Sequence, residues 1–216
     1  MALPKLAIPT FSVKLPSSGN VVEFRPFLVK EEKMLLIASE SKDTAQMINA
    51  MTKIIDACII TEGFSVKKLP FFDAEYLFLQ LRGKSVGEKV KLFYHHSQNV
   101  NRKGEECSVS TPVEINIDTI TVDVSNKPES KIMLTEDFGV IMRYPSIQDI
   151  TAVRRTDNDE IDEIDLVARC IVHAFDNEEI YESESMEEAR NFVESLSAMQ
   201  FTKISQFFEN VPQLTH

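Results

Sequence analysis

Residues 88–117 read EKVKLFYHHSQNVNRKGEECSVSTPVEINI. On both sides of a polar insert, apolar side chains occupy every second position, at Val90, Leu92, Tyr94, Val113, Ile115 and Ile117. A period of two is typical of β-strands, whose successive side chains point to opposite faces. The stretch therefore predicts an antiparallel hairpin with a long loop, an arm that spans about residues 88–118.

The segments before this arm predict a strand pair covered by helices. Residues 11–25 alternate around the turn sequence PSSGN at 16–20, and residues 30–39 have helical composition. After a cap at Asp43 or Thr44, apolar residues recur on a helical period at Met47, Ile48, Met51, Ile54, Ile55 and Cys58. Pro70 predicts the start of a further helix, which Gly83 or Gly87 would end.

The segments after the arm predict two short strands, at 132–134 and 140–142, and then mainly helices. Helix is expected from Ser146, over residues 161–174, from the capping box at Ser185, and over 201–211. The sequence thus predicts an α+β protein. We expect an α+β domain over residues 1–145, which carries the arm, and a helical C-terminal portion over 146–216 packed on it.

The charge and the cysteine content limit the classes of protein to which this chain can belong. The 216 residues hold 34 acidic and 23 basic side chains, and a pI near 4.9 disfavours nucleic acid as a ligand. Residues 109–216 carry 22 of the acidic groups, so the charge is dipolar and suits oriented protein contacts. Three separated cysteines predict a reducing compartment, and the absence of a long apolar run predicts no membrane contact.

Motifs for catalysis and cofactor binding are incomplete. Arg82-Gly83-Lys84-Ser85 resembles the end of a phosphate-binding loop, but Phe78 stands where that loop needs its first glycine. The calcium-like run from Asp157 has Asp162 at the position that requires glycine. His173 lies in an apolar helical stripe, and no Gly-x-Ser-x-Gly elbow occurs. We expect no enzyme, no cofactor and no catalytic residue.

A zinc-binding module or metal-dependent enzyme remains the alternative. His95, His96 and Cys107 flank the insert of the arm, and these residue types suit zinc. Adjacent histidines on a strand point to opposite faces and a fourth ligand is not evident, so exposed loop residues are the competing interpretation. A weaker third hypothesis is a nucleic-acid binder that uses basic side chains of the arm, namely Lys89, Lys91, Arg102 and Lys103.

Two groups of residues remain as candidates for protein contacts. An apolar stripe near the C-terminus either packs in the core or anchors a partner in a helix-in-groove contact; it comprises Phe201, Ile204, Phe207 and Phe208. Arg25, Lys30 and Lys33 either meet an acidic partner or form a solvated surface.

Three segments carry a resemblance to a known family. They are FRPFLVKEEK at 24–33, LPFFDAEYLFLQLRGKSVGE at 69–88 and IMRYPS at 141–146. In order and spacing, from about residue 20 to 150, the chain resembles the baseplate hub family of T-even-type contractile-tailed bacteriophages. Relatives often carry a Cys-x-x-Cys pair in the following hairpin, where this chain has Tyr94-His95-His96 and the single Cys107.

The resemblance implies a non-enzymatic role in building the hub of the tail baseplate. The implied partners are other phage baseplate hub and tail proteins, with no membrane and no nucleic acid, and the oligomeric state is left open. The implied location is the host cytoplasm during assembly, with the virion tail baseplate as the other possibility for the finished particle.

Overall fold

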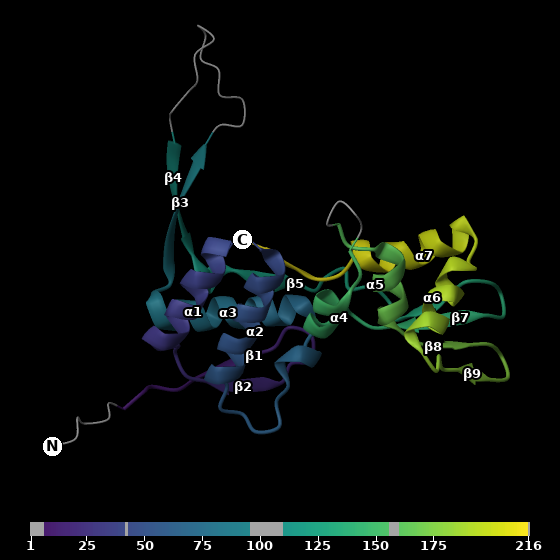
Figure 1. Cartoon of the computed structure of the whole chain (residues 1–216), viewed down its shortest axis with the longest axis horizontal. Helices are drawn as coiled ribbons and strands as arrows, with labels where there is room; N and C mark the ends of the chain where they lie inside the picture. Colours follow the sequence, from purple (N-terminus) through teal and green to yellow (C-terminus); the bar gives the residue numbers. More distant parts are fainter. Residues whose placement is uncertain (1–6, 42, 96–109, 156–159, 216) are drawn as a thin grey trace, which may run out of the picture.

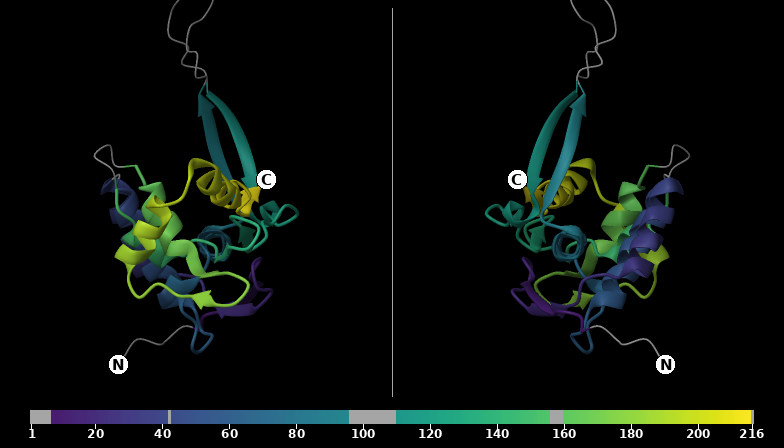
Figure 2. Two further views of the ribbon diagram at one scale, coloured as in Figure 1. Left: turned by 90° about the vertical axis from the view of Figure 1, so that its right-hand side faces the viewer. Right: turned by 90° about the vertical axis from the view of Figure 1, so that its left-hand side faces the viewer.

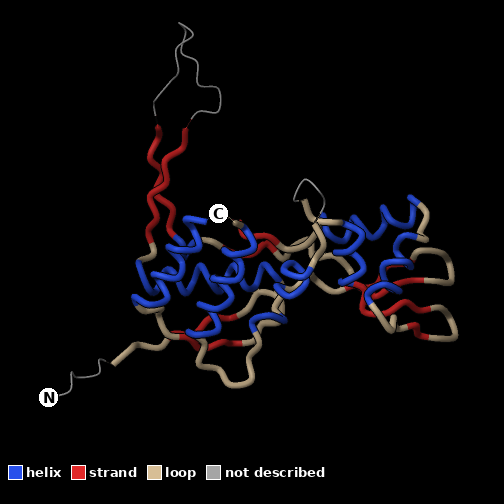
Figure 3. Tube along the Cα trace, in the orientation of Figure 1, coloured by secondary structure: helices blue, strands red, loops and turns tan. Residues whose placement is uncertain are grey.

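The structure, a computed structural model, describes residues 7–41, 43–95, 110–155 and 160–215. Its helices are α1 (Val29–Ser41), α2 (Thr44–Cys58), α3 (Phe71–Val86), α4 (Ile147–Ala152), α5 (Glu163–Cys170), α6 (Met186–Glu194) and α7 (Ala198–Glu209). Its strands are β1 (Phe11–Lys14), β2 (Val21–Phe24), β3 (Lys89–His95), β4 (Ser110–Asn116), β5 (Thr121–Asp123), β6 (Lys131–Met133), β7 (Gly139–Met142), β8 (Ile171–Phe175), β9 (Ile180–Tyr181) and β10 (Gln213–Thr215). All strand pairs are antiparallel, which confirms the predicted α+β class (Figure 3).

The first lobe is built around the β1–β2 hairpin, which pairs Phe11 with Phe24. Apolar side chains of this hairpin pack against α2 and α3 in one cluster, with Val22, Phe24, Ile54, Ile55, Leu77 and Leu81 at its centre. Local signals fix the helix ends. The Asp43 carboxylate accepts hydrogen bonds from the first turn of α2, and Gly87, at φ +126°, follows the end of α3.

The second lobe is a four-stranded sheet in the order β6-β7-β8-β9 packed against α5, α6 and α7. Its buried cluster comprises Leu134, Val140, Met142, Val167, Ala168, Cys170, Ala174, Ala189, Val193, Ile204 and Phe207. Figure 1 shows the two lobes side by side, with α4 between them. The chain end returns to the first lobe, where β10 pairs with β5.

The two hydrophobic clusters do not follow the predicted boundary at residues 145/146. Ile147 of α4 belongs to the first cluster, whereas Leu134, Val140 and Met142, which precede the boundary, belong to the second. The division of the chain into two domains stays a prediction.

One expected helix is corrected. The sequence predicts helix over residues 161–174, but α5 ends at Cys170 and β8 begins at Ile171. The reason is a non-local pairing, since β7 places Ile141 opposite His173 and Val140 opposite Ala174. A short apolar run is compatible with either element, and pairing with β7 decides it. His173 therefore lies on a strand.

The predicted arm is present as the β3–β4 hairpin, which stands away from the first lobe (Figure 1, Figure 2). Its base is fixed at the end of α3. Ile117 is almost fully buried against Gly83, and its N–H donates to the Glu88 carbonyl at 2.7 Å. Among the described helices, none combines the length and apolarity needed to span a membrane.

Candidate interaction surfaces

The β3–β4 arm presents apolar side chains on a hairpin that nothing else in the described chain covers. Tyr94 is 58% exposed, and it lies on the same face as Leu92 and Val113, which pair across the strands. Phe93, 62% exposed, lies on the opposite face. An isolated two-stranded ribbon is only weakly stable in water, and its free edges and apolar faces suit a partner. The arm is the first candidate surface.

One ion pair joins the two strands of the arm, and two more lie at its base. Lys89 Nζ lies 2.7 Å from Glu114 Oε1, and Lys84, at the base, contacts both Glu88 and Asp118. These exposed pairs add little stability. Of the basic residues that the nucleic-acid hypothesis names, Lys89 is paired in this way and Lys91 is exposed. Arg102 and Lys103 lie outside the described residues.

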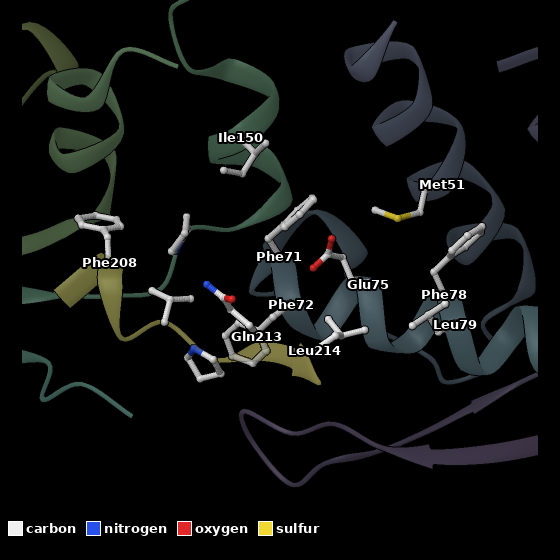
Figure 4. A pocket seen from close by; sticks show the side chains of 13 residues that line it. Met51, Phe71, Phe72, Glu75, Phe78, Leu79, Ile150, Phe208, Gln213 and Leu214 are labelled. Atoms are coloured by element: carbon white, nitrogen blue, oxygen red, sulfur yellow. The ribbon is translucent and has the colours of Figure 1, made fainter. Parts of the chain in front are cut away.

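A groove of about 680 Å³ lies where the lobes meet, between α2, α3, α4 and the C-terminal segment. Its walls are mostly aromatic and aliphatic: Met51, Phe71, Phe72, Phe78, Leu79, Pro145, Ile150, Phe208, Val211, Pro212 and Leu214, with Glu75 and Gln213 as polar members. Figure 4 shows Glu75 on α3 with its carboxylate directed into the groove beside Phe71. This groove is the second candidate surface.

The Glu75 carboxylate has no hydrogen-bond or ionic partner among the described residues. Burial therefore acts alone, and it raises the pKa of Glu75 above its ordinary value. An apolar groove with one uncompensated carboxyl group favours a ligand that brings a hydrogen-bond donor or a positive charge. Glu75 was not among the residues that the sequence indicated as functional. Its available signal was a second acid, after Asp73, within the apolar run from Phe71 to Leu77.

Of the three basic residues near the first strand pair, Arg25 is engaged within the lobe, and the choice between an acidic partner and a solvated surface stays open for the other two. Arg25 donates to Glu31 Oε1 at 3.0 Å and to the carbonyls of Pro26 and Ala57, so its guanidinium holds the first lobe together. Burial alone would raise the pKa of Glu31, but the Arg25 guanidinium and other donors outweigh it and lower that pKa. Lys30 and Lys33 remain exposed on α1.

The apolar stripe near the C-terminus packs in the core, so the helix-in-groove alternative is wrong. Ile204 and Phe207 are buried in the second cluster, and Phe201 and Phe208 pack against it. Phe207 stacks on Tyr144 with 5.7 Å between ring centroids. The stripe stabilises the second lobe, although Phe208 also reaches the wall of the groove.

The metal hypothesis concerns residues that the structure does not place in full. His96 and Cys107 lie outside the described residues, and so does the His95 side chain. Within the described ranges, no group of three or more His, Cys, Asp or Glu side chains could hold a metal ion. Cys58 and Cys170 are free thiols buried in the two clusters.

The segments that carry the family resemblance have structural roles. Arg25, in the first segment, binds Glu31. Asp73, in the second segment, is fully buried and accepts hydrogen bonds from the Ser17 amide and hydroxyl. Arg143, in the third segment, binds Asp149. Ser17 and Asp73 lie 56 residues apart, and each of the other two pairs joins the end of a strand to the helix that follows it. These residues therefore stabilise the fold.

Comparison with known proteins adds one finding. The model of the family described as T4 bacteriophage base plate protein matches residues 8–216, which extends beyond the segments that carry the resemblance. A search of curated proteins and a search of solved structures each found no match.

Proposed function

The chain belongs to the family of T4 bacteriophage base plate proteins, and on that premise we propose that it is a non-enzymatic component of the baseplate hub, or a factor that assembles the hub. It acts by binding other hub and tail proteins in the host cytoplasm during assembly. A component that stays in the particle would reside in the tail baseplate.

The observation that supports this role best is the exposed arm. A hairpin with Leu92, Phe93 and Tyr94 in solvent gains stability when a partner covers it, because apolar area is then removed from water. Two free strand edges also allow a partner strand to add to the ribbon. Such a surface serves assembly without any chemical step, so we expect the protein to turn over no substrate.

Co-expression with the hub proteins of the same phage tests the proposal. We expect the full chain to copurify with at least one of them. The double variant Leu92→Thr/Tyr94→Thr keeps residues that favour strands but removes the apolar face, and it should lose the complex. Lys91→Thr, on the opposite face, is the matched control and should retain it.

The possible outcomes test the hub role and the contact surface separately. If the wild-type chain binds no hub protein, the hub role is wrong while the family membership stands. If the double variant binds as well as the control, the arm is not the contact surface. Mass spectrometry of purified particles distinguishes a permanent component, present at a fixed copy number, from an assembly factor that has left.

A further inference from the structure

Helix α1 has an apolar face that the first lobe does not cover. Its inner face is formed by Glu31, Leu35 and Ala38. The consecutive residues Met34-Leu35-Leu36-Ile37 place apolar side chains on all sides, so Leu36 and Ile37 remain 59% and 60% exposed, and Val29 80%. Figure 1 shows α1 at the outer edge of the first lobe.

The charges on this outer face have a definite order. At 100° per residue, Val29, Lys33, Leu36 and Glu40 fall within a sector of about 60°, opposite Ala38. Lys33 and Glu40 are both exposed, and neither pairs with another described residue. Ile37 lies about 40° outside this sector on one side, and the exposed Glu32 lies about 40° outside it on the other. Along the helix the face therefore presents Lys33, then Leu36 with Ile37 beside it, and then Glu40.

This order is self-complementary in one orientation only. A second α1 that runs antiparallel, with the two-fold axis between Leu36 and Ile37, sets Lys33 opposite Glu40 of the copy at both ends. The same axis sets Leu36 against Ile37 of the copy. A parallel arrangement in register would instead place like charges opposite each other. Isologous contacts of this kind form closed pairs.

We propose that α1 is a homodimer contact, in which a second copy of the chain packs antiparallel on the outer face defined by Val29, Lys33, Leu36, Ile37 and Glu40. A 13-residue helix is about 20 Å long, and its contact is smaller than the roughly 800 Å² per partner of a standard stable interface. The dimer is therefore weak in dilute solution, and the high local concentration of a growing assembly favours it.

Sedimentation velocity of the full chain, from about 10 µM to 1 mM, tests the proposal. We expect a concentration-dependent monomer–dimer equilibrium. Lys33→Glu alone and Glu40→Lys alone each replace two attractive pairs with two repulsive ones, and should weaken the dimer roughly tenfold. The double variant Lys33→Glu/Glu40→Lys should restore it, since the charges are only exchanged.

Leu36→Glu should abolish the dimer, and Lys53→Glu, an exposed charge reversal on α2, is the matched control that should leave it unchanged. Circular dichroism establishes that each variant is folded. A wild-type chain that stays monomeric to 1 mM overturns the proposal, and so does a dimer that persists in Leu36→Glu. Failure of the double variant to recover rejects the antiparallel register.

Discussion

Arg143 binds the carboxylate of Asp149 with both ends of its guanidinium, Nη1 to Oδ2 at 2.5 Å and Nη2 to Oδ1 at 3.0 Å. Nη2 also donates to the carbonyl of Arg169, at the end of α5. Asp149 in turn accepts from the amide and hydroxyl of Ser146, which completes the N-terminal cap of α4. One side chain therefore connects β7 of the second lobe with α4, which packs on the first.

Arg143→Ala should destabilise the protein by about 2–3 kcal/mol, because the buried Asp149 carboxylate then loses its counter-charge. Urea denaturation followed by circular dichroism measures the change. Lys84→Ala, which breaks an exposed pair with Glu88, is the control and should cost less than about 1 kcal/mol. An equal effect of the two substitutions would show that the Arg143 pair does not join the lobes energetically.

Glu75→Gln should make the protein more stable at neutral pH. Burial raises the pKa of Glu75 in the folded state, so the folded chain binds the proton more tightly than the unfolded chain. The contribution of Glu75 is fully present below the unfolded pKa and is lost as pH rises through the folded pKa. The advantage of the glutamine variant should therefore appear at pH 7 and vanish near pH 4.

Thermal unfolding at both pH values measures this difference, with Glu62→Gln at an exposed position as the control. A Glu75→Gln variant that is less stable than the wild type at pH 7 would mean that the carboxylate has a favourable partner.

Ser17→Ala should cost about 1–2 kcal/mol of unfolding free energy. Asp73 is fully buried, its pKa is raised by burial, and Ser17 supplies the hydrogen bonds that it accepts in the described chain. Removal of the hydroxyl leaves a carboxyl oxygen without a donor. Ser18→Ala, one residue further in the same exposed turn, should change stability by about 0.5 kcal/mol or less. Equal losses for the two serines would contradict a structural role for Asp73.

Cys58 and Cys170 should resist alkylation in the native protein. Burial raises the pKa of the Cys170 thiol to about 12 and also raises that of Cys58, and a thiol reacts as its thiolate. At pH 8 we expect native labelling of both to be at least about a hundredfold slower than labelling in urea. Mass spectrometry of peptides after iodoacetamide treatment measures the rate at which each cysteine is labelled. Rapid modification without denaturant would show that the two clusters open readily.

Local signals in the sequence predicted many elements correctly. The strand pair around residues 16–20, the Asp43 cap, the helix after Pro70 and the arm each depend on neighbours within a few residues. The helix predicted through residue 174 was wrong, because residues 171–175 form a strand that pairs with β7, which is distant in the sequence. The role of Arg25 was also missed, since Glu31 and the Ala57 carbonyl approach it only when α1 and α2 pack together.

The sequence alone determined the α+β class and the arm, because periodicity, caps and turn residues act over short stretches of chain, and three of its segments carried the family resemblance. Tertiary structure alone decided which apolar side chains are left in solvent. Phe207 is buried in the core and Leu36 is exposed, although both lie in helices with similar apolar content. Exposure depends on which elements meet across the whole chain. The outer face of α1 is therefore defined only when the first lobe packs, and the groove around Glu75 only when the two lobes meet.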